Sequence, residues 1–193
     1  RLGSSFSLPL PFTLSPGAKC TLSMTVEDER RNKTRFSFLL KGKNNNIPSL
    51  IINELSMKGT QSNPDRIELY VLSPGDTAGV LVEDDKYSFS LPSMKVNEGD
   101  LILIYWDKTT TKKSWERDRG RMTYVLSASS PSTLGGTEGL LLMKTEEEGE
   151  IMDAVFYSEK GEDAFKEGEK NRLFLLAKEW GIWEGEPFDS SLI

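Results

Sequence analysis

The sequence predicts an all-β protein, either a sandwich or a barrel, and three observations lead to this prediction. Short apolar segments recur along most of the chain at a spacing that is typical of strands. Several of these segments alternate apolar and polar side chains, which is the period of a half-buried strand. Turn-forming residues separate the segments, and helical periodicity is confined to one stretch near the C-terminus. Together these features favour an all-β fold.

The first group of predicted strands precedes a polar linker. Phe6–Leu10 alternates weakly, and Leu14–Lys19 contains the Pro and Gly of a turn. Cys20–Val26 and Thr34–Leu40 then alternate clearly on either side of a charged loop. The linker, Lys41–Pro48, is rich in Asn and Lys, and the strand pattern restarts after it. A domain boundary is therefore predicted in the linker.

The second group contains eight predicted strands, separated by turns rich in Gly, Asp and Glu. They are Ser49–Leu55, Arg66–Val71, Val80–Glu83, Tyr87–Leu91, Leu101–Trp106, Thr123–Leu126, Gly139–Lys144 and Ile151–Tyr157. The turn Thr133–Gly139 contains three glycines, which lack the spacing of a phosphate-binding loop. We expect these glycines to allow positive φ values in a loop before a strand.

One short helix is predicted at Asn171–Trp180, and Gly181 follows it as a helix stop. Apolar side chains recur there at the i, i+3, i+4 and i+7 positions, which form one face of a helix. These side chains are Leu173, Leu176, Ala177 and Trp180.

Composition excludes several classes of function. The 193 residues include no histidine, which excludes Ser-His and Cys-His catalysis and His-based zinc sites. An enzyme built on this chain would need carboxylates, a Lys or Tyr base, or a carboxylate-bound metal. The single cysteine, Cys20, cannot form an internal disulfide and is predicted to be a buried, inert thiol. No apolar run is long enough to span a membrane, and no motif indicates a cofactor.

The stretch Ile51–Tyr70, "IINELSMKGTQSNPDRIELY", resembles the opening of the lamin tail domain, a small immunoglobulin-like β-sandwich. That family has a strand ending in Ile-Asn-Glu, a polar loop, and then Asp-x-Ile-Glu-Leu. The matching residues here are Ile52, Asn53, Glu54, Asp65, Ile67, Glu68 and Leu69. Arg66 stands where the family often has Trp, which leaves the pairing of this strand open.

Two later segments are similar to lamin tail segments and occur in the same order. In "LPSMKVNEGDLILIYWD" a Gly-Asp turn leads into an apolar strand. In "STLGGTEGLLLMKTEEEGEIMDAVFYS" an acidic turn leads into Asp-Ala-Val-x-Tyr, which begins at Asp153. The resemblance implies an immunoglobulin-like sandwich over residues 47–158. It also implies framework roles for Asn53, Glu54, Asp65, Glu68 and Asp153.

The resemblance also bears on the flanking segments and on location. Residues 1–46 would be either the end of another immunoglobulin-like module or strands added to the main sandwich. Residues 159–193 would be a C-terminal extension that carries the helix. No heptad rod or basic nuclear-localisation cluster occurs in the chain, so a bacterial branch of the family is implied. Proteins of this bacterial branch tend to be secreted or surface-attached, so the resemblance implies an extracytoplasmic location for this chain.

Glu54 and Glu68 allow a second interpretation. If their strands pair through the intervening loop, the two carboxylates could lie close together. A pair about 5 Å apart suits a retaining glycosidase, and a wider pair suits an inverting one. The alternative is a framework role, in which the carboxylates satisfy loop amides or pair with Arg66, Arg121 or a lysine. The framework role is favoured.

The segment Asp107–Met122 is the best candidate for ligand contact, because it concentrates basic residues in an acidic chain of net charge −6. Its candidate contact residues are Lys112, Lys113, Trp115, Arg117, Arg119 and Arg121. They could contact phosphates, sulfated glycans or an acidic protein face, or could simply keep a loop soluble. Four acidic residues offered as metal ligands, Asp76, Glu83, Asp84 and Asp85, match no calcium-loop spacing, and no metal site is predicted.

The sequence therefore predicts a non-enzymatic interaction or adhesion module of a secreted or surface-attached bacterial protein, binding through exposed loops. Protein or glycan partners are expected, and the negative net charge makes nucleic acid the less favoured partner. Two alternatives remain open: a structural spacer between other domains, and a carboxylate-based glycan hydrolase.

Overall fold

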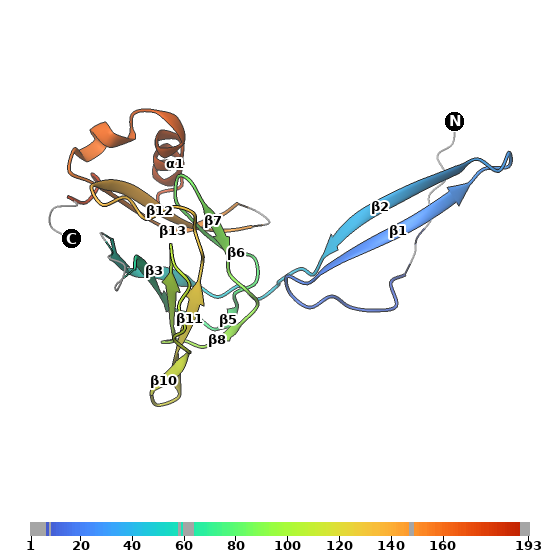
Figure 1. Cartoon of the computed structure of the whole chain (residues 1–193), viewed down its shortest axis with the longest axis horizontal. Helices are drawn as coiled ribbons and strands as arrows, with labels where there is room; N and C mark the ends of the chain where they lie inside the picture. The colour runs from blue at the N-terminus through green and yellow to red at the C-terminus, as the bar shows by residue number, and fades with distance from the viewer. Residues whose placement is uncertain (1–6, 8, 58, 60–63, 147–148, 190–193) are drawn as a thin grey trace. The chain divides into compact units, whose positions relative to one another are not determined.

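A computed structural model shows a mostly β protein with several sheets and a helix near the C-terminus (Figure 1). The residues that it describes are 7, 9–57, 59, 64–146 and 149–189. At this level the predicted fold class is confirmed. The chain divides into two compact units, residues 1–45 and residues 46–193. In the described part of the chain, no helix is long and apolar enough to cross a membrane.

The first unit is an antiparallel hairpin of β1 (Lys19–Glu27) and β2 (Lys33–Lys41). Its turn is held by Asp28, whose carboxylate accepts hydrogen bonds from the backbone N–H groups of Arg30 and Asn32, both at 2.8 Å. Of the expected strand Phe6–Leu10, residues 6 and 8 lie outside the described part of the chain, and the remaining residues form no strand.

One face of this hairpin is apolar and exposed. Leu22 pairs with Phe38 and Met24 pairs with Phe36, so these side chains share a face. The two phenylalanine rings stack at 6.4 Å, yet their side chains remain 42% and 47% exposed. Cys20, on the same face, is partly exposed rather than buried. All the buried apolar residues described in the chain belong to the second unit.

The second unit contains a five-stranded sheet in the order β10-β11-β9-β4-β3. Its strands are β3 (Leu50–Ser56), β4 (Arg66–Val71), β9 (Leu101–Tyr105), β10 (Trp115–Asp118) and β11 (Arg121–Ser127). Neighbouring strands are antiparallel except β9 and β11, which run parallel. The expected loop Asp107–Met122 is therefore partly a strand, because β10 forms a hairpin with β11.

A four-stranded antiparallel sheet has the order β13-β12-β6-β7. Its strands are β6 (Val80–Glu83), β7 (Ser88–Ser90), β12 (Glu138–Thr145) and β13 (Ile151–Ser158). The short strands β5 (Gly75–Asp76) and β8 (Lys95–Val96) form a separate pair that sequence periodicity did not predict. Two-residue strands are too short to show any alternation.

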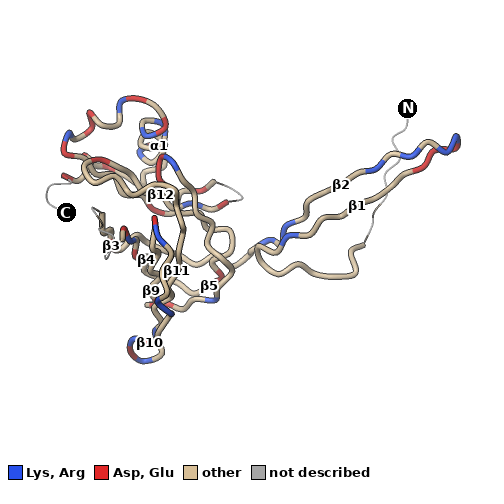
Figure 2. Tube along the Cα trace, in the orientation of Figure 1, with Lys and Arg blue, Asp and Glu red and all other residues tan. Residues whose placement is uncertain are grey.

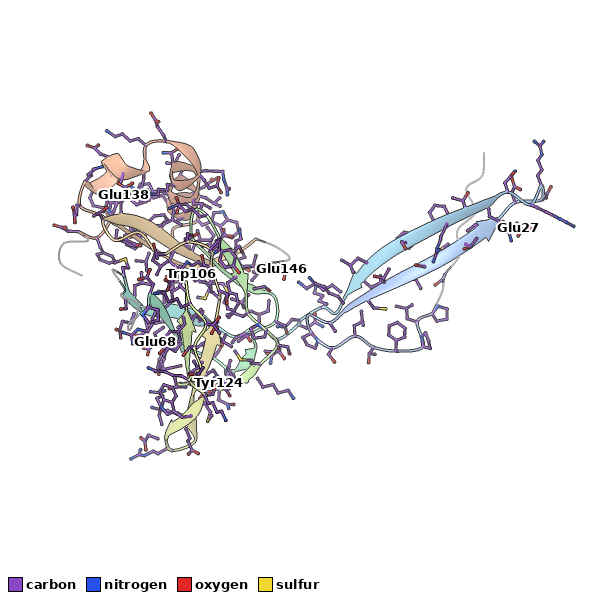
Figure 3. All side chains as sticks on the ribbon, viewed as in Figure 1. Glu27, Glu68, Trp106, Tyr124, Glu138 and Glu146 are labelled. Carbon is purple, nitrogen blue, oxygen red and sulfur yellow. The ribbon has the colours of Figure 1, made fainter. Side chains whose placement is uncertain are left out.

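The two sheets share one apolar core. Ile67 on β4 and Ile102 on β9 contribute to the same buried cluster as Val82 on β6 and Leu141 on β12. Trp106, which follows β9, is fully buried in this cluster (Figure 3). Its indole N–H donates to Asp84 Oδ2 at 3.2 Å, and Tyr87 meets its ring edge-to-face at 5.6 Å. The indole is therefore both packed and hydrogen-bonded.

A third layer covers the outer face of β12 and β13, and it consists of a 3₁₀ turn, η1 (Gly161–Phe165), and α1 (Gly168–Glu179) (Figure 1). It forms a second apolar cluster with the two strands. The buried members of this cluster are Leu140, Leu142, Ile151, Ala154, Phe156, Phe165, Leu173, Phe174 and Ala177. Residues 159–189 thus belong to the second compact unit.

The helix uses a face that differs slightly from the predicted one. Phe174 is buried, whereas Trp180 is 48% exposed and Leu176 is only partly buried. The helix ends at Glu179, so Trp180 lies beyond its last turn and leaves the apolar face. Gly181 follows with φ 67°, which agrees with its expected role as a helix stop.

Two glycines of the turn Thr133–Gly139 have a different role from the predicted one. Neither Gly135 nor Gly139 has a positive φ. A Cβ atom on Gly139 would lie 2.3 Å from the hydroxyl oxygen of Tyr157, and one on Gly135 would lie 2.0 Å from the carbonyl oxygen of Glu138. These glycines are therefore required for close packing rather than for an unusual backbone angle.

Candidate functional site

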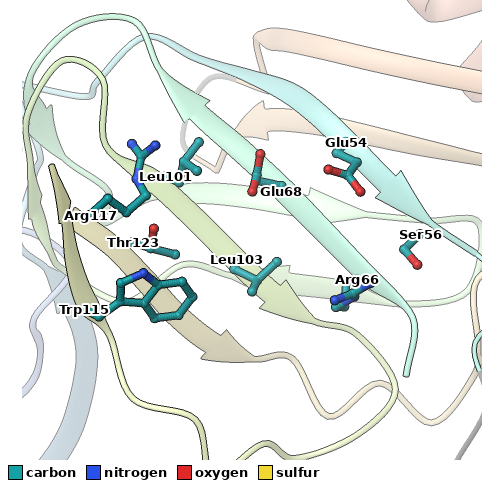
Figure 4. A pocket seen from close by; sticks show the side chains of 9 residues that line it. All are labelled: Glu54, Ser56, Arg66, Glu68, Leu101, Leu103, Trp115, Arg117 and Thr123. Atoms are coloured by element: carbon teal, nitrogen blue, oxygen red, sulfur yellow. The ribbon is translucent and has the colours of Figure 1, made fainter. Parts of the chain in front are cut away.

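A pocket of about 300 Å³ lies on the outer face of the five-stranded sheet (Figure 4). Its lining residues are Glu54, Ser56, Arg66, Glu68, Leu101, Leu103, Trp115, Arg117 and Thr123. Strand alternation explains how they come together. Ile67 and Leu69 on β4, and Ile102 and Ile104 on β9, point into the core, so the residues between them point outward.

The lining follows the register of the sheet. Trp115 pairs with Thr123, and Thr123 pairs with Leu101, which forms one row across β10, β11 and β9. In the next row, Leu103 pairs with Glu68, and Glu68 pairs with Glu54. The pocket therefore has an aromatic and apolar side on β9 and β10 and an acidic side on β3 and β4.

The two carboxylates are neighbours because β3 contains a bulge. Ile52 pairs with Leu69 on the core side, and the register then shifts so that Glu54 pairs with Glu68 on the outer side. The bulge residue, Asn53, donates from its amide to Glu68 Oε1 at 2.7 Å. The sequence raised the possibility that Glu54 and Glu68 lie close together. In the structure they lie directly opposite each other on the adjacent strands β3 and β4. A bulge commonly re-aims side chains in this way.

Two polar atoms of the lining have no partner among the described residues. Thr123 is only 2% exposed, and its hydroxyl is buried without a hydrogen bond. The Nε atom of Arg66 is also buried without one. An unpaired buried donor or acceptor costs free energy, so most such groups in folded proteins are paired with protein, water or a ligand.

Trp115 and Arg117 form the β10 wall of the pocket. Trp115 is 44% exposed, so part of its ring is accessible to a ligand. The guanidinium of Arg117 donates to the carbonyl oxygen of Gly99, which fixes its position beside the pocket. The register of the β10–β11 hairpin shifts between Glu116 and Asp118, which places Arg117 at a bulge.

The other predicted contact residues do not line the pocket. The Lys112 amino group lies 5.6 Å above the ring of Tyr105, and Lys113 is exposed. Arg119 has φ 49° at the hairpin turn and lies 3.9 Å from a carboxylate oxygen of Asp118. Arg121 packs against Gly99.

Basic and acidic residues alternate at the tip of the β10–β11 hairpin, so this tip does not present a purely basic surface (Figure 2).

Two other carboxylates hold backbone segments beside the pocket. Asp65, which is 1% exposed, accepts hydrogen bonds at 2.8 Å from the N–H groups of Gly59 and Leu134. Asp153 on β13 accepts one at 2.6 Å from the N–H of Ile52 on β3, next to the bulge. Burial raises the pKa of both carboxyls above the ordinary aspartate value.

The acidic residues considered as metal ligands take part in turns and ion pairs. Asp84 Oδ1 accepts from the N–H groups of Lys86 and Tyr87. Glu83 forms an ion pair with Lys144 at 2.6 Å. Asp76 accepts from the hydroxyl of Ser93 at 2.8 Å. Throughout the residues described, no three or more Cys, Asp or Glu side chains are arranged to hold a metal ion.

Five lining residues were not predicted as site residues: Ser56, Arg66, Leu101, Leu103 and Thr123. Each occupies an outward position in a predicted strand or at its end, so strand alternation was the available signal. The sequence did not show which strands are neighbours, and the parallel pairing of β9 with β11 brings Thr123 beside Leu101. Arg66 carried a clearer signal, because it departs from the lamin tail pattern.

A family model described as "protein second domain" matches residues 48–191. The chain belongs to this family. The matched segment extends from β3 to beyond α1, so it includes every residue of the pocket and also the third layer over β12 and β13. No curated protein matches the chain at a significant level.

Proposed function

We propose that the second unit is a non-enzymatic interaction module that binds a partner through the outer face of the five-stranded sheet. The pocket carries this proposal, because it combines an accessible indole, two guanidinium groups and two carboxylates on one surface. Specific binding sites generally join an apolar surface to a few positioned polar groups. The site differs from the exposed loop expected from the sequence, since adjacent strands supply its lining.

The strands give this site a fixed geometry. Glu54 and Glu68 are held by sheet pairing, and Asn53 and Arg117 make the hydrogen bonds that orient the surface. Side chains fixed before binding lose less conformational entropy when a ligand arrives. A prearranged surface of this kind supports a recognition role.

We further propose that the domain is a lamin-tail-like, immunoglobulin-like sandwich of a secreted or surface-attached bacterial protein. Two sheets around one core, the β3–β4 opening hairpin and the β12–β13 closing hairpin support this assignment. The expected location can be tested by adding protease to intact cells that produce the protein. Degradation without lysis supports a surface location, and protection until lysis contradicts it.

The function can be tested with purified ligands of several classes. The full chain is immobilised and exposed to neutral and sulfated glycans, duplex DNA and purified extracellular-matrix proteins. We expect saturable binding to at least one class, and we expect W115A to weaken it about tenfold or more because the exposed indole is lost. W180A is the matched control, since Trp180 is similarly exposed but lies outside the pocket.

Two results would contradict this assignment. If no ligand class binds, the structural spacer becomes the better model. If binding occurs but W115A and W180A weaken it equally, the partner does not use the pocket.

A carboxylate-based glycan hydrolase is the second candidate, because Glu54 and Glu68 oppose each other and line one pocket. Directly opposed residues have Cβ atoms about 4.5–5.5 Å apart, and a retaining glycosidase needs carboxyls about 5 Å apart. Against this candidate, Glu54 is exposed, whereas a general acid usually occupies an apolar environment. Release of reducing sugar from polysaccharides by the wild type, abolished in both E54Q and E68Q, would establish the hydrolase.

A further inference from the structure

The chemistry of the pocket narrows the class of ligand. Its apolar part consists of Leu101 and Leu103 on β9, beside the half-exposed indole of Trp115 (Figure 4). Aromatic faces carry negative potential and attract the weakly positive C–H groups of a ligand. A ligand with a flat face of C–H groups would therefore fit this side of the pocket.

The charges of the lining balance. Glu54 and Glu68 contribute two negative charges, and Arg66 and Arg117 contribute two positive ones. Within the described residues, no ion pair neutralises Glu54, Glu68 or Arg66. A polyanion would meet the two carboxylates, and a polycation would meet the two guanidinium groups. The pocket therefore favours a ligand without a large net charge.

The polar groups of the lining supply both acceptors and donors of hydrogen bonds. Carboxylates only accept, guanidinium groups only donate, and the Thr123 hydroxyl can do both. The Thr123 hydroxyl and Arg66 Nε are buried without partners among the described residues. A ligand hydroxyl is both donor and acceptor, so it can pair with the carboxylates and with the guanidinium groups of the lining. Many hydroxyls on a largely uncharged molecule are characteristic of sugars.

We propose that this pocket binds a neutral saccharide. A pyranose ring stacks its C–H face on Trp115. Its hydroxyl groups donate hydrogen bonds to Glu54 and Glu68 and accept them from the guanidinium group of Arg66. Hydrogen bonds to charged groups are stronger than those between neutral groups, so the four charged side chains provide specificity. The volume of about 300 Å³ is at the small end for ligand sites, which suits one or two sugar units of a longer chain. This inference rests on the proposed function, because it names the ligand of the same surface.

Titration with defined tetrasaccharides tests the proposal. The full chain is titrated by calorimetry with cellotetraose, maltotetraose, mannotetraose and chitotetraose, and with a heparin-derived tetrasaccharide as the charged counterpart. We expect one or more neutral sugars to bind with a dissociation constant below about 1 mM, and the heparin fragment to bind more weakly. Cleavage products are measured in the same samples.

Variants locate the binding. W115A should lower the affinity about tenfold or more, through loss of the stacking surface. E68Q should also weaken binding, because a neutral amide is a poorer acceptor for hydroxyls. W180A should leave the affinity unchanged within about twofold. Circular dichroism and thermal melting of each variant show whether the fold is retained, and E68Q keeps the inference testable if W115A unfolds.

Several outcomes overturn the saccharide assignment. It fails if no neutral sugar binds up to about 10 mM, if the heparin fragment binds best, or if W115A and E68Q bind as the wild type does. If a matrix protein still binds in a Trp115-dependent manner, the interaction function survives and only the saccharide class is lost. If nothing binds through this face, both proposals fail.

Discussion

Asp153 shows how one side chain can align two sheets. It belongs to β13 of the four-stranded sheet, yet it accepts the N–H of Ile52 on β3 of the five-stranded sheet at 2.6 Å. The bulge at Asn53 follows directly, and it determines that Glu54 faces Glu68 across the pocket. A residue outside the pocket therefore helps to set the geometry of the pocket.

The titration of Asp153 gives a prediction at the residue scale. Burial raises its pKa in the folded protein above the ordinary value of 3.8. The unfolded state therefore loses this proton first as pH rises, and stability falls as pH rises through the folded pKa. We expect the advantage of the wild type over D153N in free energy of unfolding to be larger at about pH 3 than at about pH 7.

Urea unfolding of both proteins across this pH range provides the measurement. The amide introduced by D153N accepts fewer hydrogen bonds than the carboxyl, and this lowers stability by an amount that does not depend on the Asp153 proton. The way in which the difference in free energy of unfolding between the two proteins changes with pH therefore reports the titration of the Asp153 carboxyl alone. If the stability advantage of the wild type over D153N stays constant or grows as pH rises, burial does not raise the pKa of Asp153.

At the scale of the element, β12 is buried on both faces. Leu141 and Met143 contribute to the core between the sheets, and Leu140 and Leu142 contribute to the cluster under α1. This explains why the strand is almost continuously apolar instead of alternating. The sequence pattern predicted the strand, but it did not reveal that a helical layer covers its second face.

The packing of α1 on this strand gives a matched pair of variants. Phe174 is 5% exposed and meets the Phe156 ring edge-to-face at 4.9 Å, whereas the adjacent Leu175 is 55% exposed. We expect F174A to destabilise the protein by about 3–5 kcal/mol, because it leaves a cavity in the second cluster. L175A should change stability by less than about 0.5 kcal/mol, since it removes little buried surface.

Chemical denaturation of the two variants measures this difference. Similar losses of stability in F174A and L175A would mean that the helix does not pack on β13 through the face that carries Phe174.

At the scale of the whole molecule, the two units differ in how their apolar side chains are used. The second unit contains two apolar clusters, whereas the described side chains of the first contribute none to the buried core. A two-stranded hairpin without a covered face is at best marginally stable in water. Most of the folding stability of the protein should therefore come from the second unit, residues 46–193.

Removal of residues 1–45 tests this conclusion. The shortened protein should retain its β-rich circular dichroism spectrum, and its melting temperature should change by less than about 2 °C. Scanning calorimetry of the full and shortened chains provides the measurement. A decrease larger than about 5 °C, which corresponds to more than about 1 kcal/mol at this size, would show that the hairpin stabilises the rest.

The pocket shows how far sequence reasoning extends at this scale. Glu54, Glu68, Trp115 and Arg117 were all candidates, but they belonged to two unrelated hypotheses, an acidic pair and a basic loop. The structure brings them to one surface because β10, β11, β9, β4 and β3 are neighbours in one sheet. Pairing between strands distant in the chain depends on long-range packing, which local periodicity does not encode.

The sequence alone determined the β-rich class, most of the strands, the C-terminal helix and the absence of histidine chemistry. These properties follow from local periodicity, turn residues and composition, each of which acts over a few neighbouring residues. Only the tertiary structure decided the strand order, the shift of register at Asn53 and the helical layer over β12. Those features depend on which apolar faces bury each other, and this is settled by contacts between residues far apart in the chain.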